Sequence, residues 1–422
     1  MLNLCISAVS SNSGKTILTT ALLHHYKANV RPYKIGPDYI DPQFHKMVCN
    51  TPSVNLDSFI MNENQVKWIF NKYKKDVNIL EGVMGFYDGE NKGCSAYSVS
   101  KLLNIPTILI LDASGSYITI SAVLKGLLTY KEQNTIKAIV LNNVSSSMHY
   151  ELIKSQIEQD HQDILILGWI KKNLQTLNNT HLGLDLDDIS KIETISSEVL
   201  QNIDLQLLMT LETLETKNTI KDTLTYPFER LEAINKHIAI VTSKDSFSFL
   251  YHDNIQFLKE VFKKVSIINP SHDEVIPSNA DVVYICGGYV ETTKAYESLK
   301  NSNDFKQSLI IHSISKSIYA ECAGLLYLGN KVDDKIMTGI LDVDFTLDSK
   351  FNRLGYYYNS SNIKGHSFHY TKELDNTNAI DILSKTKGGK GKPGSWKKDK
   401  IFGTYLHTMF RNNSKLIKTY FI

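Results

Sequence analysis

A phosphate-binding loop is the first feature of the sequence that indicates chemistry. The apolar run Leu4–Val9 is followed by SSNSGKT (Ser10–Thr16) and then by a helix-like segment that begins ILTTALL. In this strand–loop–helix order, backbone N–H groups and the positive end of the helix can hold phosphates. Lys15 would reach the β- and γ-oxygens, and the Thr16 hydroxyl would bind Mg²⁺. Val9 stands where the G-x-x-x-x-G-K-[ST] pattern has its first glycine, so the alternative is a GKT that falls by chance at a helix start.

Carboxylates follow the loop at places where a cation bound to a nucleotide is usually held. Asp38 and Asp41 lie in KIGPDYIDPQFH, whose two prolines disfavour a helix and predict a stiff loop. Glu81 stands directly after an apolar strand predicted at Val77–Leu80, and a carboxylate at such a strand end binds Mg²⁺ or its waters. The segments NLD and GFYDG add two further candidates, Asp57 and Asp88. The alternative for any one of these residues is an aspartate that forms a turn or a residue that caps a helix.

The segment IYAECAGLLYLG predicts a nucleophile on a sharp turn. Cys322 stands between a predicted strand and a predicted helix among small residues, as a nucleophile elbow requires, and a thiol at a helix N-terminus is expected to have a lowered pKa. Gly287 and Gly288 of CGGYVE follow an apolar strand and, with the amide of Ala323, can form an oxyanion hole. His407 in FGTYLHTMF follows another apolar strand and is a candidate base. The alternative is a buried cysteine and a histidine with structural roles.

The composition is that of an ordinary globular protein. Of the 422 residues, 42% are apolar and 21% are charged, which suggests two or three domains and excludes disorder, collagen and coiled coil. A formal charge of +2 gives no argument for nucleic acid or a membrane as partner, and no apolar run approaches the ~18 residues of a bilayer span. The first residues lack the basic character of a signal peptide. Five scattered cysteines form no disulfide framework and no CxxC pair, which predicts a reducing cytoplasm.

Short apolar runs alternate with helix-like segments along the chain, which predicts an α/β fold. In the first half the predicted strands are Leu4–Val9, Val30–Ile35, Val77–Leu80, Thr107–Leu111, Ala138–Leu141 and Ile164–Leu167. The predicted helices there are Ile17–Lys27, Gln65–Tyr73 and Tyr117–Lys131. A second series has strands at His237–Val241, Val265–Ile268, Val282–Ile285 and Ile318–Ala320, and a helix at Asn254–Phe262. Such alternation favours parallel sheets with binding sites at the carboxyl ends of the strands.

Two segments differ in composition from the rest. Residues 210–225 contain six Thr and mixed charges with weak periodicity, which predicts a connection between two domains with a boundary near residues 225–236. Residues 385–400 contain seven Lys and four Gly, which predicts a solvated loop.

Taken together, these motifs resemble the cobyrinate a,c-diamide synthase family, in the same order and over nearly the whole chain. The most specific parts are GPDYIDP, EGVMGFYDG and AECAGLLYLG. The resemblance implies a P-loop NTPase domain of the dethiobiotin-synthetase type at residues 1–209. It further implies a linker at 210–235 and a class I glutamine amidotransferase domain of α/β fold at 236–422.

The activity that the resemblance implies is the amidation of the a and c acetate carboxylates of cobyrinate, with ATP and glutamine consumed. Mg·ATP would activate a carboxylate as an acyl phosphate in the first domain, and ammonia released by Cys322 would reach it across the domain interface. Mg²⁺ and ATP are then the cofactor and co-substrate, and the other partners are a corrinoid and L-glutamine. Nucleic acid and membrane are not expected, and the oligomeric state stays open, with a homodimer among the alternatives.

The resemblance also implies a role for individual residues. The ATP phosphates would be held by Ser13, Gly14, Lys15 and Thr16, and adenine by Asn142. Mg²⁺ would be held by Thr16, Asp38 and Glu81. The corrinoid or the acyl phosphate would be lined by Asp41, Asp57 and Asp88. Ammonia release would use Cys322 as nucleophile, His407 as its activator and the amides of Gly287, Gly288 and Ala323 as oxyanion hole.

The chain departs from the family pattern at a few positions. Ala8 and Asn12 stand in a loop that is usually richer in glycine, and Val290 replaces a typical proline. Asn tolerates a positive φ, so the loop can keep its shape. Met409 stands where many class I glutaminases have a glutamate, which predicts a Cys–His dyad whose histidine is oriented by another group.

Several alternatives remain at the level of the sequence. Related enzymes of the same domain types act on cobyric acid precursors, hydrogenobyrinate or nickel sirohydrochlorin, and a P-loop ATPase switch with an inactive glutaminase module is a different class. His366 and His369 in GHSFHYT form either a metal pair or, as we favour, a structural or interface element. The lysines of residues 385–400 would, in a further hypothesis, contact a polycarboxylate substrate.

Overall fold

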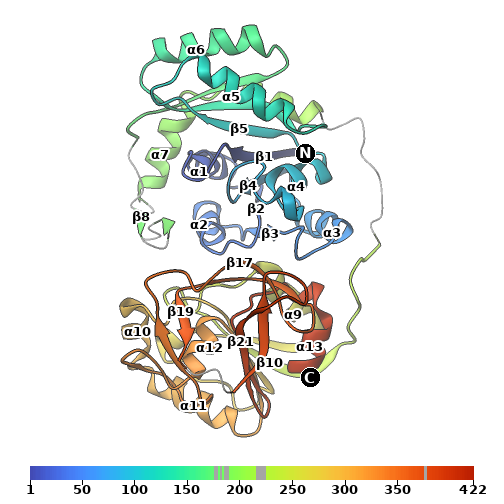
Figure 1. Ribbon diagram of the computed structural model, residues 1–422, viewed down its shortest axis with the longest axis vertical. Helices are drawn as coiled ribbons and strands as arrows, with labels where there is room; N and C mark the ends of the chain where they lie inside the picture. Colours follow the sequence, from blue (N-terminus) through green and yellow to red (C-terminus); the bar gives the residue numbers. More distant parts are fainter. Residues whose placement is uncertain (175–178, 181–182, 185–189, 215–224, 375–377) are drawn as a thin grey trace. The chain divides into compact units, whose positions relative to one another are not determined.

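The computed structural model describes residues 1–174, 179–180, 183–184, 190–214, 225–374 and 378–422 (Figure 1). The chain forms two compact units, which are unit 1 (Met1–Pro227) and unit 2 (Phe228–Ile422). The division between them falls inside residues 210–235, the stretch that the sequence predicts as a linker.

A parallel sheet of seven strands forms the centre of unit 1, in the order β3-β2-β4-β1-β5-β6-β7. Its strands are β1 (Leu2–Ala8), β2 (Val30–Ile35), β3 (Val54–Leu56), β4 (Val77–Gly82), β5 (Thr107–Asp112), β6 (Ile136–Val144) and β7 (Leu165–Lys171). The helices are α1 (Lys15–His25), α2 (Ile40–Cys49), α3 (Glu63–Tyr73), α4 (Ala96–Leu103), α5 (Ile118–Thr129), α6 (Ser147–Asp160), α7 (Ser190–Leu200) and α8 (Leu205–Met209). The predicted parallel α/β arrangement of this unit is confirmed, with element ends that shift by a few residues.

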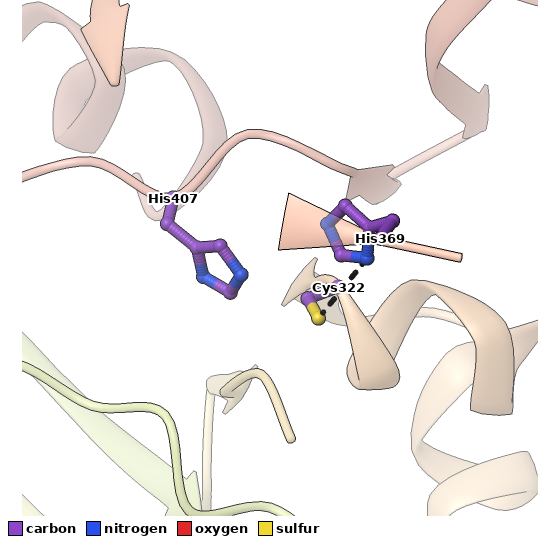
Figure 2. A group of neighbouring side chains, drawn as sticks. All are labelled: Cys322, His369 and His407. Atoms are coloured by element: carbon purple, nitrogen blue, oxygen red, sulfur yellow. Dashed lines mark hydrogen bonds between the residues drawn. The ribbon is translucent and has the colours of Figure 1, made fainter. Parts of the chain in front are cut away.

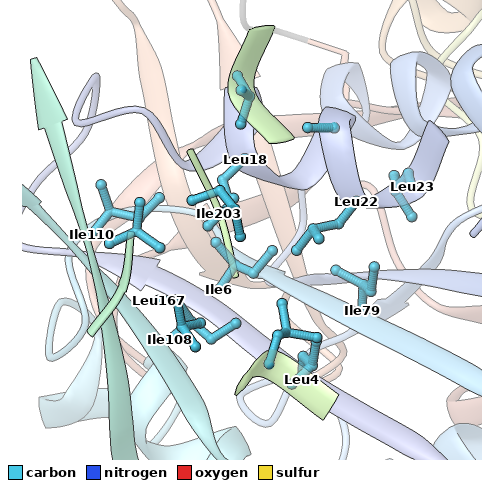
Figure 3. Packing of buried hydrophobic residues seen from close by; sticks show 14 of the residues in the cluster. Leu4, Ile6, Leu18, Leu22, Leu23, Ile79, Ile108, Ile110, Leu167 and Ile203 are labelled. Carbon is cyan, nitrogen blue, oxygen red and sulfur yellow. The ribbon is translucent and has the colours of Figure 1, made fainter. Parts of the chain in front are cut away.

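The core of unit 1 lies between the central strands and α1. Leu4 and Ile6 of β1 lie beside Ile108 of β5, and Leu18 and Leu22 of α1 pack onto them (Figure 3). These side chains are almost completely buried. Each such side chain contributes roughly 1.5–3 kcal/mol of hydrophobic free energy. This packing fixes the start of α1 against the end of β1, and therefore the loop between them.

The segment around Asp41 is a helix, where the sequence predicted a stiff loop. α2 begins at Ile40 and includes Pro42 in its first turn. A proline at that place removes no helical hydrogen bond, because the first amides of a helix have no partner within it. Asp38 precedes the helix, and its Oδ1 accepts a hydrogen bond from the Ile40 N–H at 2.8 Å.

Unit 2 is built on a sheet of nine strands in the order β11-β10-β12-β13-β22-β21-β20-β17-β18. The first five are parallel, namely β11 (Phe262–Ile268), β10 (Ile234–Val241), β12 (Val282–Ile285), β13 (Ser317–Glu321) and β22 (Ile401–Thr404). The others run antiparallel to their neighbours, namely β21 (Gly391–Lys398), β20 (Ala379–Ser384), β17 (Arg353–Tyr358) and β18 (Lys364–His369). The helices are α9 (His252–Val261), α10 (Thr293–Leu299), α11 (Asn303–Ser313), α12 (Ala323–Leu328) and α13 (Ser414–Tyr420).

The antiparallel part of this sheet curls back toward the parallel part. His366 of β18 and His407, which follows β22, exchange two backbone hydrogen bonds of 2.9 and 2.8 Å. A second, smaller sheet in the order β15-β14-β16-β19 completes the unit, with strands Lys335–Ile336, Lys331–Val332, Asp344–Leu347 and Thr371–Glu373. The curl brings β18 to the carboxyl end of the parallel strands.

Residues 385–400 do not form the predicted solvated loop. They contain β21, which pairs with β20 on one side and with β22 on the other. Ser395 and Trp396 are buried, whereas Lys397 and Lys398 are exposed. Lys and Gly disfavour a strand, but backbone pairing on both sides outweighs that preference.

Within the part of the chain that is described, the structure has no helix with the length and hydropathy that a bilayer crossing needs.

Candidate active site

The phosphate-binding loop of unit 1 has a backbone suited to an anion. Asn12 has a φ of 60° and Gly14 a φ of 100°, left-handed conformations that asparagine tolerates and that glycine adopts freely. α1 begins at Lys15, and its N-cap is Gly14, which makes no side-chain cap. Amides at the start of a helix that are not capped by a side chain can bind an anion. The prediction that Asn12 lets the loop keep its shape through a positive φ is confirmed.

Thr16 and Glu81 lie in direct contact at this loop. The Thr16 hydroxyl donates a hydrogen bond to Glu81 Oε1 at 2.9 Å. Lys15 Nζ donates to the Ser10 carbonyl at 2.8 Å, across the loop. Two of the three residues expected to hold Mg²⁺ are therefore neighbours, because β1 and β4 are adjacent strands that end at the same edge of the sheet.

A buried cation that the sequence analysis did not single out, Lys34, joins the acidic residues. Its Nζ lies 3.6 Å from Asp38 Oδ2 and 3.3 Å from Glu81 Oε1, and it forms an ion pair with Asp41. His45 Nε2 lies 2.8 Å from Glu81 Oε2. The signal was present in the sequence, because a lysine within a buried strand needs carboxylate partners.

The charges of this cluster depend on one another. Burial disfavours the ammonium of Lys34, but Asp41, Glu81 and Asp38 together raise its pKa above the usual range. Burial likewise disfavours the carboxylate of Glu81, but Lys34, His45 and Thr16 outweigh it and lower the pKa of Glu81 well below its usual range. Burial raises the pKa of Asp41 to about 7, since a single ammonium is shared with two other carboxylates. Glu81 is therefore the permanent anion at the loop.

Three of the predicted binding residues hold backbone in place. Asp57 Oδ1 accepts hydrogen bonds of 2.9 Å from two backbone amides that follow it in the chain. Asp88 Oδ2 accepts one from the Gly85 N–H at 2.8 Å. Asn142 Nδ2 donates to the Ser13 carbonyl at 2.9 Å and so supports the phosphate-binding loop. The predicted contacts of these three side chains with substrate or adenine stay predictions.

Cys322 forms the turn between β13 and α12 in unit 2. Its φ of 55° and ψ of −111° are strained for a residue with a side chain. Its N–H donates to the Thr404 carbonyl at 2.8 Å, because β13 and β22 pair in parallel with Glu321 beside Thr404. The predicted strand, sharp turn and helix around Cys322 are confirmed.

His369 of β18 is the histidine hydrogen-bonded to the Cys322 sulfur (Figure 2). Its Nδ1 lies 3.6 Å from Sγ, and its Nε2 lies 3.1 Å from the Tyr405 carbonyl. A carbonyl only accepts, so Nε2 carries the proton and Nδ1 accepts the S–H. Burial, then the neighbouring His407 and Arg353, hold the pKa of His369 well below 6.5. His369 is therefore neutral, with its lone pair directed at the thiol.

The two histidines of GHSFHYT do not act as a pair. His366 and His369 are three residues apart on a strand, so their side chains leave opposite faces of β18. His366 contributes its backbone to the contact with His407, whereas the side chain of His369 reaches Cys322.

Glu321 is the group that orients His407. Glu321 Oε2 lies 3.4 Å from His407 Nδ1, and both side chains are buried. The hydroxyls of Tyr284 and Tyr319 also donate to this carboxylate, at 3.1 and 3.2 Å. Burial, then the charge of Glu321, raise the pKa of both tyrosines well above 10, so they remain donors. With Nδ1–H donated to Glu321, Nε2 of His407 keeps the lone pair that a base needs.

Burial, rather than the helix N-terminus, dominates the acidity of Cys322. Burial raises its pKa well above 9, and the charges of Glu291 and Glu321 add to this, whereas backbone hydrogen bonding with Gly288 and Ala323 acts against it. The prediction of a lowered pKa is therefore wrong for this structure. The sulfur is a thiol that must give up its proton to a base when it attacks.

Gly287 and Gly288 allow the backbone to approach the sulfur closely. A Cβ on Gly287 would lie 2.3 Å from His407 Cε1 and 3.0 Å from Cys322 Cβ. Gly288 has a φ of 158°, and a Cβ there would lie 2.0 Å from the Ser246 carbonyl oxygen. The structure thus brings Cys322, His407, Gly287, Gly288 and Ala323 together, as predicted, and adds Glu321 and His369.

Comparisons with known proteins cover both units. Residues 237–415 match the model of the CobB/CobQ-like glutamine amidotransferase domain. A cobyrinate a,c-diamide synthase of Fusobacterium nucleatum is 33% identical over 446 aligned residues, which cover 99% of this chain and 99% of that protein. A cobyrinate a,c-diamide synthase of Methanococcus maripaludis is 33% identical and covers 96% of each chain. The chain therefore belongs to the cobyrinate a,c-diamide synthase family, which are glutamine-dependent ligases of cobalamin biosynthesis.

Proposed function

We propose that this protein converts the a and c acetate carboxylates of cobyrinate to amides, with glutamine as the nitrogen donor and ATP as the source of energy. The observation that carries the proposal is the buried group of Cys322, His407 and Glu321 at one sheet edge, in a chain whose full-length relatives bear that name. The strained turn at Cys322 supports it, because strain of this kind persists where function requires it.

In unit 1, the bound nucleotide would transfer its γ-phosphoryl group to a substrate carboxylate. A carboxylate oxygen attacks phosphorus, ADP leaves, and an acyl phosphate forms. Lys15 and the amides at the start of α1 would neutralise charge on the transferred group. Thr16, Glu81 and Asp38 fit a Mg²⁺ ion, since they offer a hydroxyl and two carboxylates near the loop. When bound, that ion would add positive charge at the phosphates.

In unit 2, Cys322 would release ammonia from glutamine. His407 takes the thiol proton as sulfur attacks the side-chain amide, and then gives it to the departing nitrogen. The amides of Gly287, Gly288 and Ala323 would hold the oxyanion, each for roughly 3 kcal/mol of barrier. Water then releases glutamate. Ammonia attacks the acyl carbon in unit 1, and phosphate leaves.

His369 would position the thiol and would not act as the base. A positive charge on His369 is disfavoured by burial, by His407 and by Arg353, whereas Nδ1 of His407 lies 3.4 Å from the carboxylate of Glu321. The hydrogen bond from S–H to Nδ1 of His369 sets the direction of the sulfur before glutamine binds.

Replacement of Glu321 by glutamine is expected to slow glutamate release by roughly 10²–10³-fold, because the neutral amide keeps the shape but no longer stabilises the imidazolium of His407. Amidation with added ammonium salt should be unchanged. Glutamate and ADP are measured in parallel, and Glu297→Gln, an exposed residue of α10, is the control. Equal losses with both nitrogen sources would contradict this role of Glu321.

Replacement of Gly287 by alanine should abolish glutamine-dependent activity, because the new methyl group would overlap the ring of His407. Gly93→Ala is the control, since its Cβ position meets no atom within 4 Å, although its φ of 69° adds some strain. Thermal unfolding of both variants shows whether the fold survives. An active Gly287→Ala enzyme would show that His407 is not held at this place.

The substrate is tested by product analysis. The purified protein is incubated with ATP, Mg²⁺, glutamine and one of three tetrapyrroles: cobyrinate, hydrogenobyrinate or nickel sirohydrochlorin. The mass of each product is determined by mass spectrometry. A diamide formed most rapidly from cobyrinate is expected, because relatives with that name align over nearly the whole chain. Faster amidation of hydrogenobyrinate or nickel sirohydrochlorin would show that this tetrapyrrole, and not cobyrinate, is the preferred substrate.

A further inference from the structure

The sulfur of Cys322 lies close to two imidazoles, one on β18 and one in the segment that follows β22. The described residues include one group, Cys322, His369 and His407, whose candidate ligand atoms all lie within 4.8 Å of one another. The two rings are nearly parallel, at 13°, with centroids 5.9 Å apart. Figure 2 shows both rings turned toward Cys322 from its two sides. A thiol and two imidazoles form the donor set that Zn²⁺ and similar soft cations prefer.

Each of the two histidines already has the orienting partner that metal-binding histidines use. His369 donates Nε2–H to the Tyr405 carbonyl, which leaves Nδ1 for a metal. His407 directs Nδ1 at the carboxylate of Glu321, so Nε2 is the ring nitrogen that would bind a metal. In zinc proteins the second ring nitrogen of a ligating histidine is held in this way by a carbonyl or a carboxylate.

The distances suit a tetrahedral cation with modest adjustment. Bonds of ~2.3 Å to sulfur and ~2.0 Å to nitrogen place the ligand atoms roughly 3.3–3.6 Å apart. Cys322 Sγ and His369 Nδ1 are already 3.6 Å apart. All three candidate ligand atoms already lie within 4.8 Å of one another, and a rotation of the His407 side chain can bring its nitrogen closer. Three protein ligands would leave the fourth position of the cation open.

We propose that Cys322, His369 and His407 bind Zn²⁺, and that a bound ion stops the release of ammonia from glutamine. The thiol proton passes to solvent as the sulfur–metal bond forms, and the sulfur is then no longer available to attack an amide. Unit 1 holds none of these three residues, so amidation with free ammonia continues. The effect on activity rests on the proposed function, whereas the binding of the ion does not.

Binding is measured first, on the full-length protein without substrates. Zn²⁺ affinity is obtained by competition with a chromophoric chelator, and Co²⁺ is added as a coloured substitute whose charge-transfer absorption reports a bond to thiolate. One ion per chain and a thiolate band are expected. Cys322→Ser should lose the band, and His369→Asn should weaken Zn²⁺ at least about tenfold. Cys286→Ser and His312→Asn are matched controls, a buried thiol and a buried imidazole of the same unit outside the group.

Inhibition is measured second, as product formed with glutamine and with ammonium salt at one Zn²⁺ concentration. Loss of the glutamine reaction alone supports the proposal. In His369→Asn, the same Zn²⁺ concentration should lower the glutamine reaction far less, relative to that variant's own rate without Zn²⁺. Equal inhibition of both reactions would place the ion at the nucleotide site and overturn the proposal. Unchanged Zn²⁺ affinity in Cys322→Ser and His369→Asn would overturn it as well. If no tetrapyrrole is amidated, the proposed function fails, but the chelator and Co²⁺ measurements still decide whether the ion binds.

Discussion

Replacement of Cys322 by serine should reduce glutamine-dependent amidation at least about 10³-fold and leave ammonia-dependent amidation within about twofold of the native rate. An alcohol is a far weaker nucleophile than a thiolate, and the loss of a catalytic nucleophile has effects of this order. The oxygen atom fits the same turn, so the fold should survive. The measurement is a comparison of ADP and amide formed with each nitrogen source.

Two further observations decide how this result is interpreted. Cys286→Ser changes the other cysteine of unit 2, and it should keep both reactions, because a hydroxyl can replace its hydrogen bonds to carbonyls. If Cys322→Ser folds but loses both reactions, Cys322 has a structural role, and the proposed assignment of ammonia release to unit 2 and of amidation to unit 1 is wrong.

Replacement of Lys15 by alanine, unlike that of Cys322, should reduce amidation with both nitrogen sources, by roughly 10²–10³-fold. Lys15 is expected to leave the Ser10 carbonyl and neutralise phosphate oxygens when a nucleotide binds. Removing one such group from a phosphoryl-transfer site costs about this much. ADP formation and nucleotide binding are measured together.

The matched control for this variant is Lys154→Ala, which removes a lysine from α6 of the same unit. It lies on the surface and should leave the rates unchanged. Slow release of glutamate in unit 2 should also persist in Lys15→Ala. A Lys15→Ala protein that forms ADP at the native rate would show that the GKT motif is not the nucleotide site.

The parallel parts of both sheets were predictable because a buried parallel strand must be apolar along its whole length. Val282–Ile285, which is apolar throughout, was predicted with the ends that the structure has. Val30–Ile35 was also predicted with its observed ends, although it contains Arg31 and Lys34. The phosphate-binding loop and Cys322 followed from the same logic, since each stands directly after such a strand. Short exposed strands gave no such signal, and β21 was therefore predicted as a loop.

The site residues that could not be predicted from the sequence depend on contacts between segments that are distant in the chain. His369 reaches Cys322 only because the sheet curls, and no local pattern encodes that curl. The sequence did not point to Glu321, because in many class I glutaminases the glutamate that orients the histidine stands two residues after it, where this chain has Met409. The carboxylate here comes instead from the residue before the nucleophile. The sequence predicts a loop around Asp41 because a proline usually interrupts a helix. Pro42 lies in the first turn of α2, however, where a helix accepts a proline.

The backbone conformation of Cys322 affects which residue types this position can accept during evolution. A residue with a side chain gives up roughly 1–3 kcal/mol to hold a φ of 55° and a ψ of −111°, and glycine alone escapes that penalty. Under the proposed mechanism, selection for ammonia release would keep cysteine there against this penalty. In descendants that lose this activity, drift should carry position 322 toward glycine, so the residue found there is a marker of whether the domain still works.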